Sequence, residues 1–121
     1  MSEGLGVDLV SIERIKKALK NQNFKSKVFT PQEISYCQKR KNPEIFFSAR
    51  FAAKEAVKKC LANKIKKKVG WKDIEVLNNP DGSPKINLSL ALKKNLKNNN
   101  IFITLSHTQE YAIAIAGLTK K

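Results

Sequence analysis

Residues 42–63, NPEIFFSARFAAKEAVKKCLAN, form the longest helical pattern of the chain and decide its fold. Asn42-Pro43 is typical of a helix start, and the pattern predicts a helix over about residues 44–63. At about 100° per residue, one side of this helix is apolar and consists of Phe46, Ala49, Ala53, Ala56, Val57, Cys60 and Leu61. The other side carries Phe47, Phe51, Glu55 and Lys59. We therefore expect one side to build the core and the other to line a site or an interface.

The segments around this helix predict a mostly antiparallel sheet. Alternating and β-branched runs indicate strands over residues 5–10, 71–77, 85–88, 101–105 and 111–118. Turn residues at 78–84 join the second and third of these strands as a hairpin. Shorter helices are expected after the caps Ser11, Thr30 and Ser89. This order predicts a single α+β domain over residues 1–121, with the long helix at its centre.

Length and composition exclude several classes of protein. The chain has 121 residues, 41% hydrophobic and 28% charged, so it is neither disordered nor long enough for two domains. No window approaches the ~18 apolar residues of a membrane span, and the N-terminus does not resemble a secretory signal. Cys37 and Cys60 show no metal or disulfide spacing. We expect both thiols to be reduced, the protein to be cytoplasmic, and no membrane to be a partner.

The net charge of +14 indicates a polyanionic partner, because 24 Lys and Arg stand against 10 Asp and Glu. Nucleic acid, an anionic membrane, a phosphorylated ligand and an acidic protein all have the complementary charge. Lysine supplies 21 of the basic residues and arginine 3, so part of the surplus reflects a lysine-rich composition rather than selection for phosphate binding. The position of the basic residues is therefore more informative than their total.

Two acidic residues are candidates for a metal site. Asp8 lies in an apolar strand, where a carboxylate is costly unless a cation neutralises it, although an edge strand could leave it in water. Glu55 lies on the long helix, where it could equally form an i,i+4 pair with Lys59. Two carboxylates near lysines are also what Mg²⁺ requires when it binds a phosphorylated ligand. Both interpretations stay open from these residues alone.

His107 is the only histidine, and it lies between Ser106 and Thr108 at the end of a predicted strand. In this setting a histidine can bind a phosphate or transfer a proton, or it can simply stabilise the bend. The chain contains no nucleophile elbow, P-loop or dinucleotide-binding glycine pattern. The sequence therefore argues against triad hydrolases, His-ligated zinc sites and classical nucleoside triphosphatases.

Motifs in a fixed order resemble the holo-[acyl-carrier-protein] synthase family, the short trimeric type of the 4′-phosphopantetheinyl transferase superfamily. They are LGVDL (5–9), IERI (12–15), RFAAKEA (50–56) with Lys59, WKDIEV (71–76), DGSP (81–84) and LSHTQEYA (105–112). The resemblance spans about residues 5–118. It implies the fold of that superfamily and a homotrimer with active sites at subunit boundaries, which would explain Phe47 and Phe51 on the second side of the helix.

The resemblance implies an enzyme that transfers the 4′-phosphopantetheine group of coenzyme A to a serine of apo acyl carrier protein. The reaction would serve fatty acid biosynthesis and release adenosine 3′,5′-bisphosphate. Catalytic roles are implied for Asp8, Glu55, Lys59 and His107, and Asp8 and Glu55 would hold Mg²⁺. Coenzyme A would contact Lys59, Ser106, His107, Thr108, Arg40, Lys41 and Lys64. The acidic carrier protein would contact Arg14, Lys17, Lys20 and Phe24.

Three points stay open at the level of sequence. The serine proton could pass to Glu55 or to a water on the metal, and we place both ahead of His107. Residues 62–64, Ala-Asn-Lys, stand where many family members have Gly-Thr-Gly, so backbone contacts there do not carry over. The main alternative function is a small basic domain that binds nucleic acid without catalysis, and a catalytically silent scaffold is another. A pure nucleic-acid binder would give Asp8 and Glu55 no function, so we expect no nucleic acid as partner.

Overall fold

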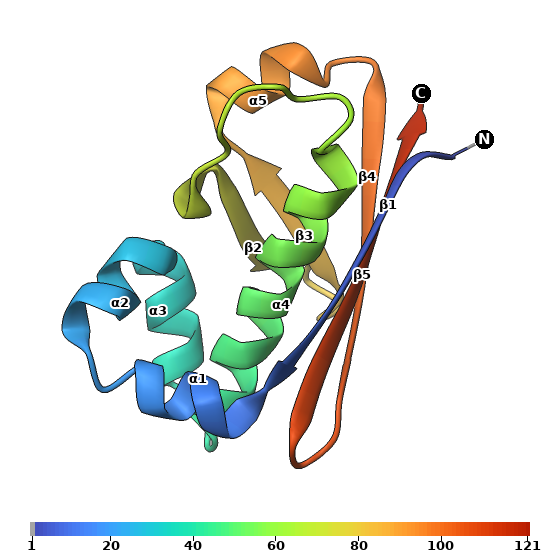
Figure 1. Ribbon diagram of the computed structural model, residues 1–121. Coiled ribbons are helices and arrows are strands. Elements are labelled where there is room, and N and C mark those ends of the chain that lie inside the picture. Colours follow the sequence, from blue (N-terminus) through green and yellow to red (C-terminus); the bar gives the residue numbers. More distant parts are fainter. Residues whose placement is uncertain (1) are drawn as a thin grey trace.

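Helix α4 (Pro43–Leu61) packs on one face of a three-stranded antiparallel sheet, as Figure 1 shows. This computed structural model describes residues 2–121, so Met1, the first residue of the predicted domain, lies outside it. The sheet order is β1-β5-β4, and a second sheet pairs β2 with β3. The other elements are β1 (Ser2–Ser11), α1 (Ile12–Ala18), α2 (Gln22–Val28), α3 (Pro31–Gln38), the 3₁₀ turn η1 (Trp71–Asp73), β2 (Ile74–Asn78), β3 (Pro84–Leu88), α5 (Leu90–Asn95), β4 (Asn99–His107) and β5 (Tyr111–Lys120). The predicted α+β class with antiparallel pairing is confirmed.

Small residues allow α4 to pack tightly on the sheet. The side chains that β5 turns toward the helix are all fully buried and are Ala112, Ala114, Ala116 and Leu118. From the helix, the main core cluster receives Ala52, Ala53, Ala56, Val57, Cys60 and Leu61. The predicted apolar side of α4 is thus confirmed as the core side, except that Phe46 is only partly buried and lies outside this cluster. Neither α4 nor any other helix within residues 2–121 is long and apolar enough to cross a membrane.

The opposite face of the three-stranded sheet, the outer face, is apolar and exposed. It consists of Leu5, Val7 and Leu9 of β1, Phe102 of β4 and Ile115 of β5, which the strand register places on one side. Leu5 is 71% exposed and Phe102 is 59% exposed. A contiguous apolar surface of this kind is typical of a protein–protein contact.

Two glycines bring β1 into direct contact with the backbone of α4. A methyl group on Gly6 would overlap the carbonyl oxygen of Ala56 and lie 2.8 Å from the amide nitrogen of Cys60. A methyl group on Gly4 would overlap the carbonyl oxygen of Cys60. Any side chain at these positions would therefore push the strand and the helix apart.

An aromatic cluster joins the small helices α1–α3 to the second side of α4. Phe47 is 2% exposed and meets Phe29 edge to face at 4.9 Å between ring centroids. Phe51 stacks on Trp71 at 5.0 Å and contacts Phe24 at 6.1 Å. The expectation that Phe47 lines a site or an interface is therefore wrong, because the helices that follow α1 bury it within the same chain.

Two local elements differ from the sequence-based expectation. Helix α2 was not expected; the side chain of Asn21 starts it by accepting hydrogen bonds from the amides of Asn23 and Phe24. The predicted strand over 71–77 begins only at Ile74, because residues 71–73 form the turn η1. Asp73 stabilises that turn by accepting a hydrogen bond from the Gly70 amide at 2.8 Å.

The two cysteines are free and buried, as expected for small hydrophobic side chains. Cys37 is 0% exposed, and burial raises the pKa of its thiol to about 11. Burial also raises the pKa of the Cys60 thiol. Neither thiol is therefore suited to act as a nucleophile.

We expect Gly6→Ala to lower the free energy of unfolding by ~1–3 kcal/mol, because the new methyl group overlaps the α4 backbone. Urea unfolding at one fixed protein concentration measures this loss. Gly70→Ala is the control, since the nearest atom to a methyl group there is the Asp73 side-chain oxygen Oδ2, at 3.3 Å, and no backbone of another element is close. Equal stability of the two variants would contradict the close packing of β1 on α4.

Candidate active site

Asp8 of β1 faces α4 rather than water, although β1 is an edge strand. Its side chain is 16% exposed, and Lys59 donates a hydrogen bond from Nζ to Asp8 Oδ1 at 3.2 Å. The other carboxylate oxygen, Oδ2, is buried and has no hydrogen-bond partner. The interpretation of Asp8 as a solvated edge residue is therefore wrong. The cation that neutralises it is the ammonium group of Lys59.

Lys59 of α4 is held by β1 and not by Glu55. Its Nζ also donates to the carbonyl oxygen of Val7 at 2.8 Å. Among the ion pairs within residues 2–121, none joins Glu55 to Lys59. The interpretation of Glu55 as an i,i+4 partner of Lys59 is therefore wrong. Glu55 is partly buried, and it takes part in no ion pair in the part of the chain described.

The packing of β1 along α4 brings Asp8 to the level of Glu55. The two glycine contacts show that a step of two residues along β1 corresponds to one turn back along α4. Both steps advance the chain by about 6 Å, so the two backbones stay in register. One further step of this register takes the strand to Asp8 and the helix to the turn that carries Glu55. The structure thus brings Asp8, Glu55 and Lys59 to one flank of α4.

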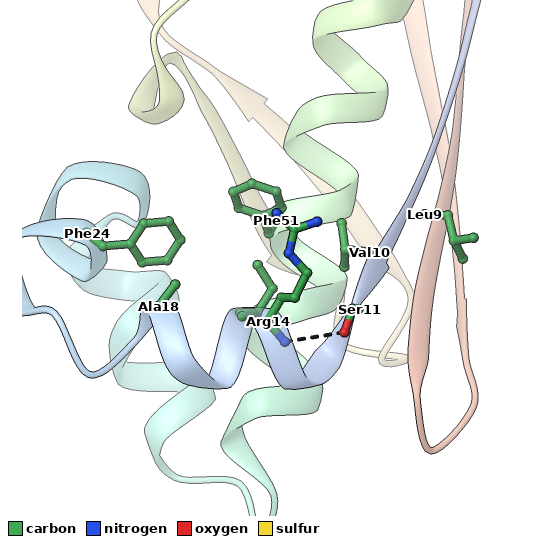
Figure 2. A pocket seen from close by; sticks show the side chains of 8 residues that line it. Leu9, Val10, Ser11, Arg14, Ala18, Phe24 and Phe51 are labelled. Atoms are coloured by element: carbon green, nitrogen blue, oxygen red, sulfur yellow. Dashed lines mark hydrogen bonds between the residues drawn. The ribbon is translucent and has the colours of Figure 1, made fainter.

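A cavity of about 260 Å³ opens beside this group, between β1, α1, α2 and α4. Arg14, Phe24 and Phe51 line it, and Figure 2 shows the Arg14 side chain and the two rings around the same space. Phe51 lies one turn before Glu55 on the same helix. Two of the residues predicted to contact the carrier protein, Arg14 and Phe24, therefore share a cavity next to the acidic pair. The other two, Lys17 and Lys20, are exposed on and just after α1.

A second cavity, of about 220 Å³, lies on the other flank of α4. Its polar lining comes from the end of β4, from α3 and α4, and from the β2–β3 hairpin, and includes Ser106, His107, Tyr36, Arg50 and Asn78. His107 Nδ1 lies 3.3 Å from the carbonyl oxygen of Thr108. The hydroxyl of Thr108 accepts from the amides of Glu110 and Tyr111 and so shapes the bend.

Arg50 is a candidate ligand-binding residue that the sequence analysis missed. Its side chain is only 4% exposed, and no carboxylate pairs with it within residues 2–121. Arg50 Nη2 donates to Asn78 Oδ1 at 2.6 Å, and the guanidinium lies over the Tyr36 ring at 4.3 Å. Its Nε is buried and has no hydrogen-bond partner. The available signal was that Arg50 is one of only three arginines in a lysine-rich chain.

The remaining predicted contacts of coenzyme A lie at two separate places. Arg40 lies over the ring of Tyr36 at 4.0 Å, and Tyr36 lines the Arg50 cavity; Lys41 is exposed in the following turn. Lys64 lies at the opposite end of α4, where its Nζ donates to Glu3 Oε1 at 3.0 Å. Lys64 and Asn99 both bind that carboxylate and lower the pKa of Glu3. Of Arg40, Lys41 and Lys64, only Lys64 forms an ion pair with an acidic residue within residues 2–121.

A fully buried ion pair fixes α4 next to Glu55. Lys54 and Glu33 of α3 are both 0% exposed and lie 2.8 Å apart. Lys54 Nζ also donates to the carbonyl oxygens of Trp71 at 3.0 Å and Ile74 at 2.6 Å. Burial lowers the pKa of Lys54, and the charge of Glu33 opposes that shift. With its three N–H groups engaged, Lys54 is a structural cation, and it holds α4 against α3, η1 and β2.

The two cavities are separate, on opposite flanks of α4. No residue lines both of them. Arg50 and Lys59 are nine positions apart, which at about 100° per residue places them on opposite flanks of α4. The structure therefore separates the predicted site into an acidic group around Asp8 and a nucleotide group around Arg50 and His107.

The donors near Asp8 fit Mg²⁺ better than zinc. Within residues 2–121, no cluster of three or more His, Cys, Asp or Glu could hold a metal. Structural and catalytic zinc sites need three or four such ligands, whereas Mg²⁺ binds one or two carboxylates and completes its shell with water and phosphate oxygens. Asp8 Oδ2, buried without a partner, is an acceptor of that kind.

Residues 4–116 match the family model of the 4′-phosphopantetheinyl transferase superfamily. The chain belongs to this superfamily. All the residues that we assign to the site lie within residues 4–116, the part of the chain that matches the family.

Individual members of the superfamily are similar over nearly the full length of the chain. A holo-[acyl-carrier-protein] synthase of Clostridium botulinum (strain Eklund 17B / Type B) is 50% identical over 119 residues, 96% of each chain. The crystal structure of holo-[acyl-carrier-protein] synthase from Neisseria meningitidis has a TM-score of 0.89 at 28% identity and covers 99% of this chain and 100% of that one. The Helicobacter pylori enzyme in complex with coenzyme A has a TM-score of 0.83 at 30% identity, over 95% and 99% of the two chains.

Proposed function

We propose that the protein transfers the 4′-phosphopantetheine group from coenzyme A to a serine of apo acyl carrier protein. Adenosine 3′,5′-bisphosphate is the second product, and the reaction serves fatty acid biosynthesis in the cytoplasm. The observation that carries the proposal is the group of Asp8, Glu55 and Lys59 on one flank of α4, with Asp8 Oδ2 buried and unpartnered. Relatives named holo-[acyl-carrier-protein] synthase support it.

Asp8 and Glu55 would hold Mg²⁺ in this reaction. Bound there, Mg²⁺ would offset negative charge on the diphosphate of coenzyme A as the bond to the leaving group breaks. Lys59 would pair with the same diphosphate, since its ammonium lies on the acidic flank. Such preorganised charge is usually the largest single contribution to catalysis.

The nucleotide end of coenzyme A would bind the second cavity. Arg50 offers a buried Nε without a partner, and Ser106 and His107 line the same space. Arg40 stacks on Tyr36 at the rim and adds a further positive charge for a phosphate.

The serine hydroxyl would lose its proton to Glu55 or to a water. A pH–rate profile that is unchanged in Glu55→Gln would exclude Glu55 as the base.

The proposal includes a homotrimer, because one chain alone separates the two halves of the site. Arg50 and Lys59 occupy opposite flanks of α4, so a second copy must bring a nucleotide group next to the acidic group. The exposed apolar outer face offers the surface for such an assembly. Its burial between copies would remove Leu5, Val7, Leu9, Phe102 and Ile115 from water.

Intact-mass measurement of apo acyl carrier protein after incubation with coenzyme A and Mg²⁺ tests the function directly. The expected result is a gain of one phosphopantetheine group. Asp8→Asn and Glu55→Gln should each lower the rate by about 10²–10³-fold, since each removes a carboxylate that would hold the Mg²⁺. Glu44→Gln, the same change in the first turn of the same helix, is the control and should keep the rate. No mass gain by the unaltered protein, together with retention on RNA or DNA, would favour the nucleic-acid alternative.

Arg14→Ala should raise the apparent KM for the carrier protein about tenfold and leave the KM for coenzyme A nearly unchanged. Arg14 lines the first cavity, and acidic helical carrier proteins have the complementary charge. High salt should reproduce the effect by screening the charges. Lys94→Ala removes one exposed charge on α5, which lines neither cavity, and serves as the control. Equal changes in both KM values would rule out α1 as the docking surface.

Leu5→Asp should convert the trimer to monomers and reduce activity by at least about tenfold, because it places a charge within the proposed apolar interface. Sedimentation velocity measures the assembly. Leu90→Asp is the control, since Leu90 is 77% exposed on α5 and lies away from the outer face. A Leu5→Asp monomer with full activity would contradict a shared site.

A further inference from the structure

Lys59 lies where it competes for the proposed cation site. Its Nζ shares the carboxylate of Asp8, with 3.2 Å to Oδ1, and its second contact is the Val7 carbonyl oxygen at 2.8 Å. No other ion pair of Asp8 occurs within residues 2–121. Lys59 is therefore the counterion that makes the partly buried Asp8 carboxylate tolerable.

The two partners of this ion pair differ in exposure to solvent. The Asp8 side chain is 16% exposed and is fixed by the strand, whereas the Lys59 side chain is 54% exposed. An ion pair with an exposed lysine contributes little net stability, so little free energy opposes its separation. Lysine has four flexible carbons, which allow the ammonium to leave Asp8 while the α4 backbone stays in place.

We propose that Lys59 is a displaceable counterion of Asp8, which couples cation binding to diphosphate binding. The inference rests on the proposed function, because it takes Asp8 as a cation ligand. A divalent cation on the same carboxylate repels the ammonium, so the ammonium moves off Asp8 when the cation binds. The released ammonium then pairs with the diphosphate of coenzyme A. Each ligand thereby favours the other, as reciprocity of binding requires.

Binding of Mn²⁺ alone, followed by electron paramagnetic resonance of the free ion, tests the competition without any turnover. Lys59→Met should bind Mn²⁺ roughly two- to fivefold more tightly than the unaltered protein, because Asp8 loses its competing cation. Lys59→Arg keeps the charge and should bind Mn²⁺ as the unaltered protein does. Lys58→Met is the matched control: it removes the same charge one residue away, from an ammonium that lies 4.1 Å over the Trp71 ring.

Repeating the titration with coenzyme A tests the coupling. The ratio of Mn²⁺ affinities with and without coenzyme A should be smaller in Lys59→Met than in the unaltered protein, because only the lysine can move from Asp8 to the phosphates. In both proteins the metal would still contact the phosphates of coenzyme A. The ratio of affinities in Lys59→Met should therefore be lower than in the unaltered protein but stay above one.

The outcomes separate this inference from the function on which it rests. Unchanged or weaker Mn²⁺ binding by Lys59→Met overturns the inference. An equal gain in Lys58→Met also overturns it, because net charge alone would then explain the effect. Failure of the cation site itself has a different signature, in which Asp8→Asn leaves Mn²⁺ binding unaffected. Thermal unfolding of each variant confirms that the comparison is made between folded proteins.

Discussion

The backbone contact between β1 and α4 is the constraint on which the rest of the structure depends. Gly6 has no side chain, so the strand can approach the carbonyl oxygen of Ala56 directly. At this separation a lysine of the helix reaches both the carbonyl of Val7 and the carboxylate of Asp8. A wider separation would break those contacts and admit water beside Asp8. The acidic flank of the site is thus a consequence of backbone packing as much as of the residues that form it.

The same helix separates the functional groups that it positions. Its core side is built from alanines and other small residues, so the helix lies close to the sheet and offers two flanks to solvent. One flank carries Glu55 and Lys59, and the other carries Arg50. In the proposed function, coenzyme A uses both kinds of group where two copies of the chain meet. The dense packing of the core would then be one cause of the proposed assembly.

The sequence predicted those features that depend on local periodicity. The long helix, its apolar side, the antiparallel strands and the acid of the first strand all follow from spacing along the chain. Features that depend on contacts between distant segments were not predictable in this way. Phe47 lies on the side of the predicted helix that also carries Glu55 and Lys59, but the packing of α2 and α3 buries it. Glu33, the partner of Lys54, lies 21 residues upstream on another helix, and no pattern in either segment indicates the pair.

The two buried cations of α4 show why burial alone does not identify a functional residue. Lys54 directs its three N–H groups to Glu33 Oε1 and to two backbone carbonyls, so it has no donor left for a ligand. Arg50 is nearly as buried but faces an aromatic ring and one amide oxygen, and its Nε remains without a partner. A buried guanidinium without a carboxylate is costly unless an anion completes its environment. In a chain with a net charge of +14, it is this unpaired arginine, and not the number of surface lysines, that points most directly to a phosphorylated ligand.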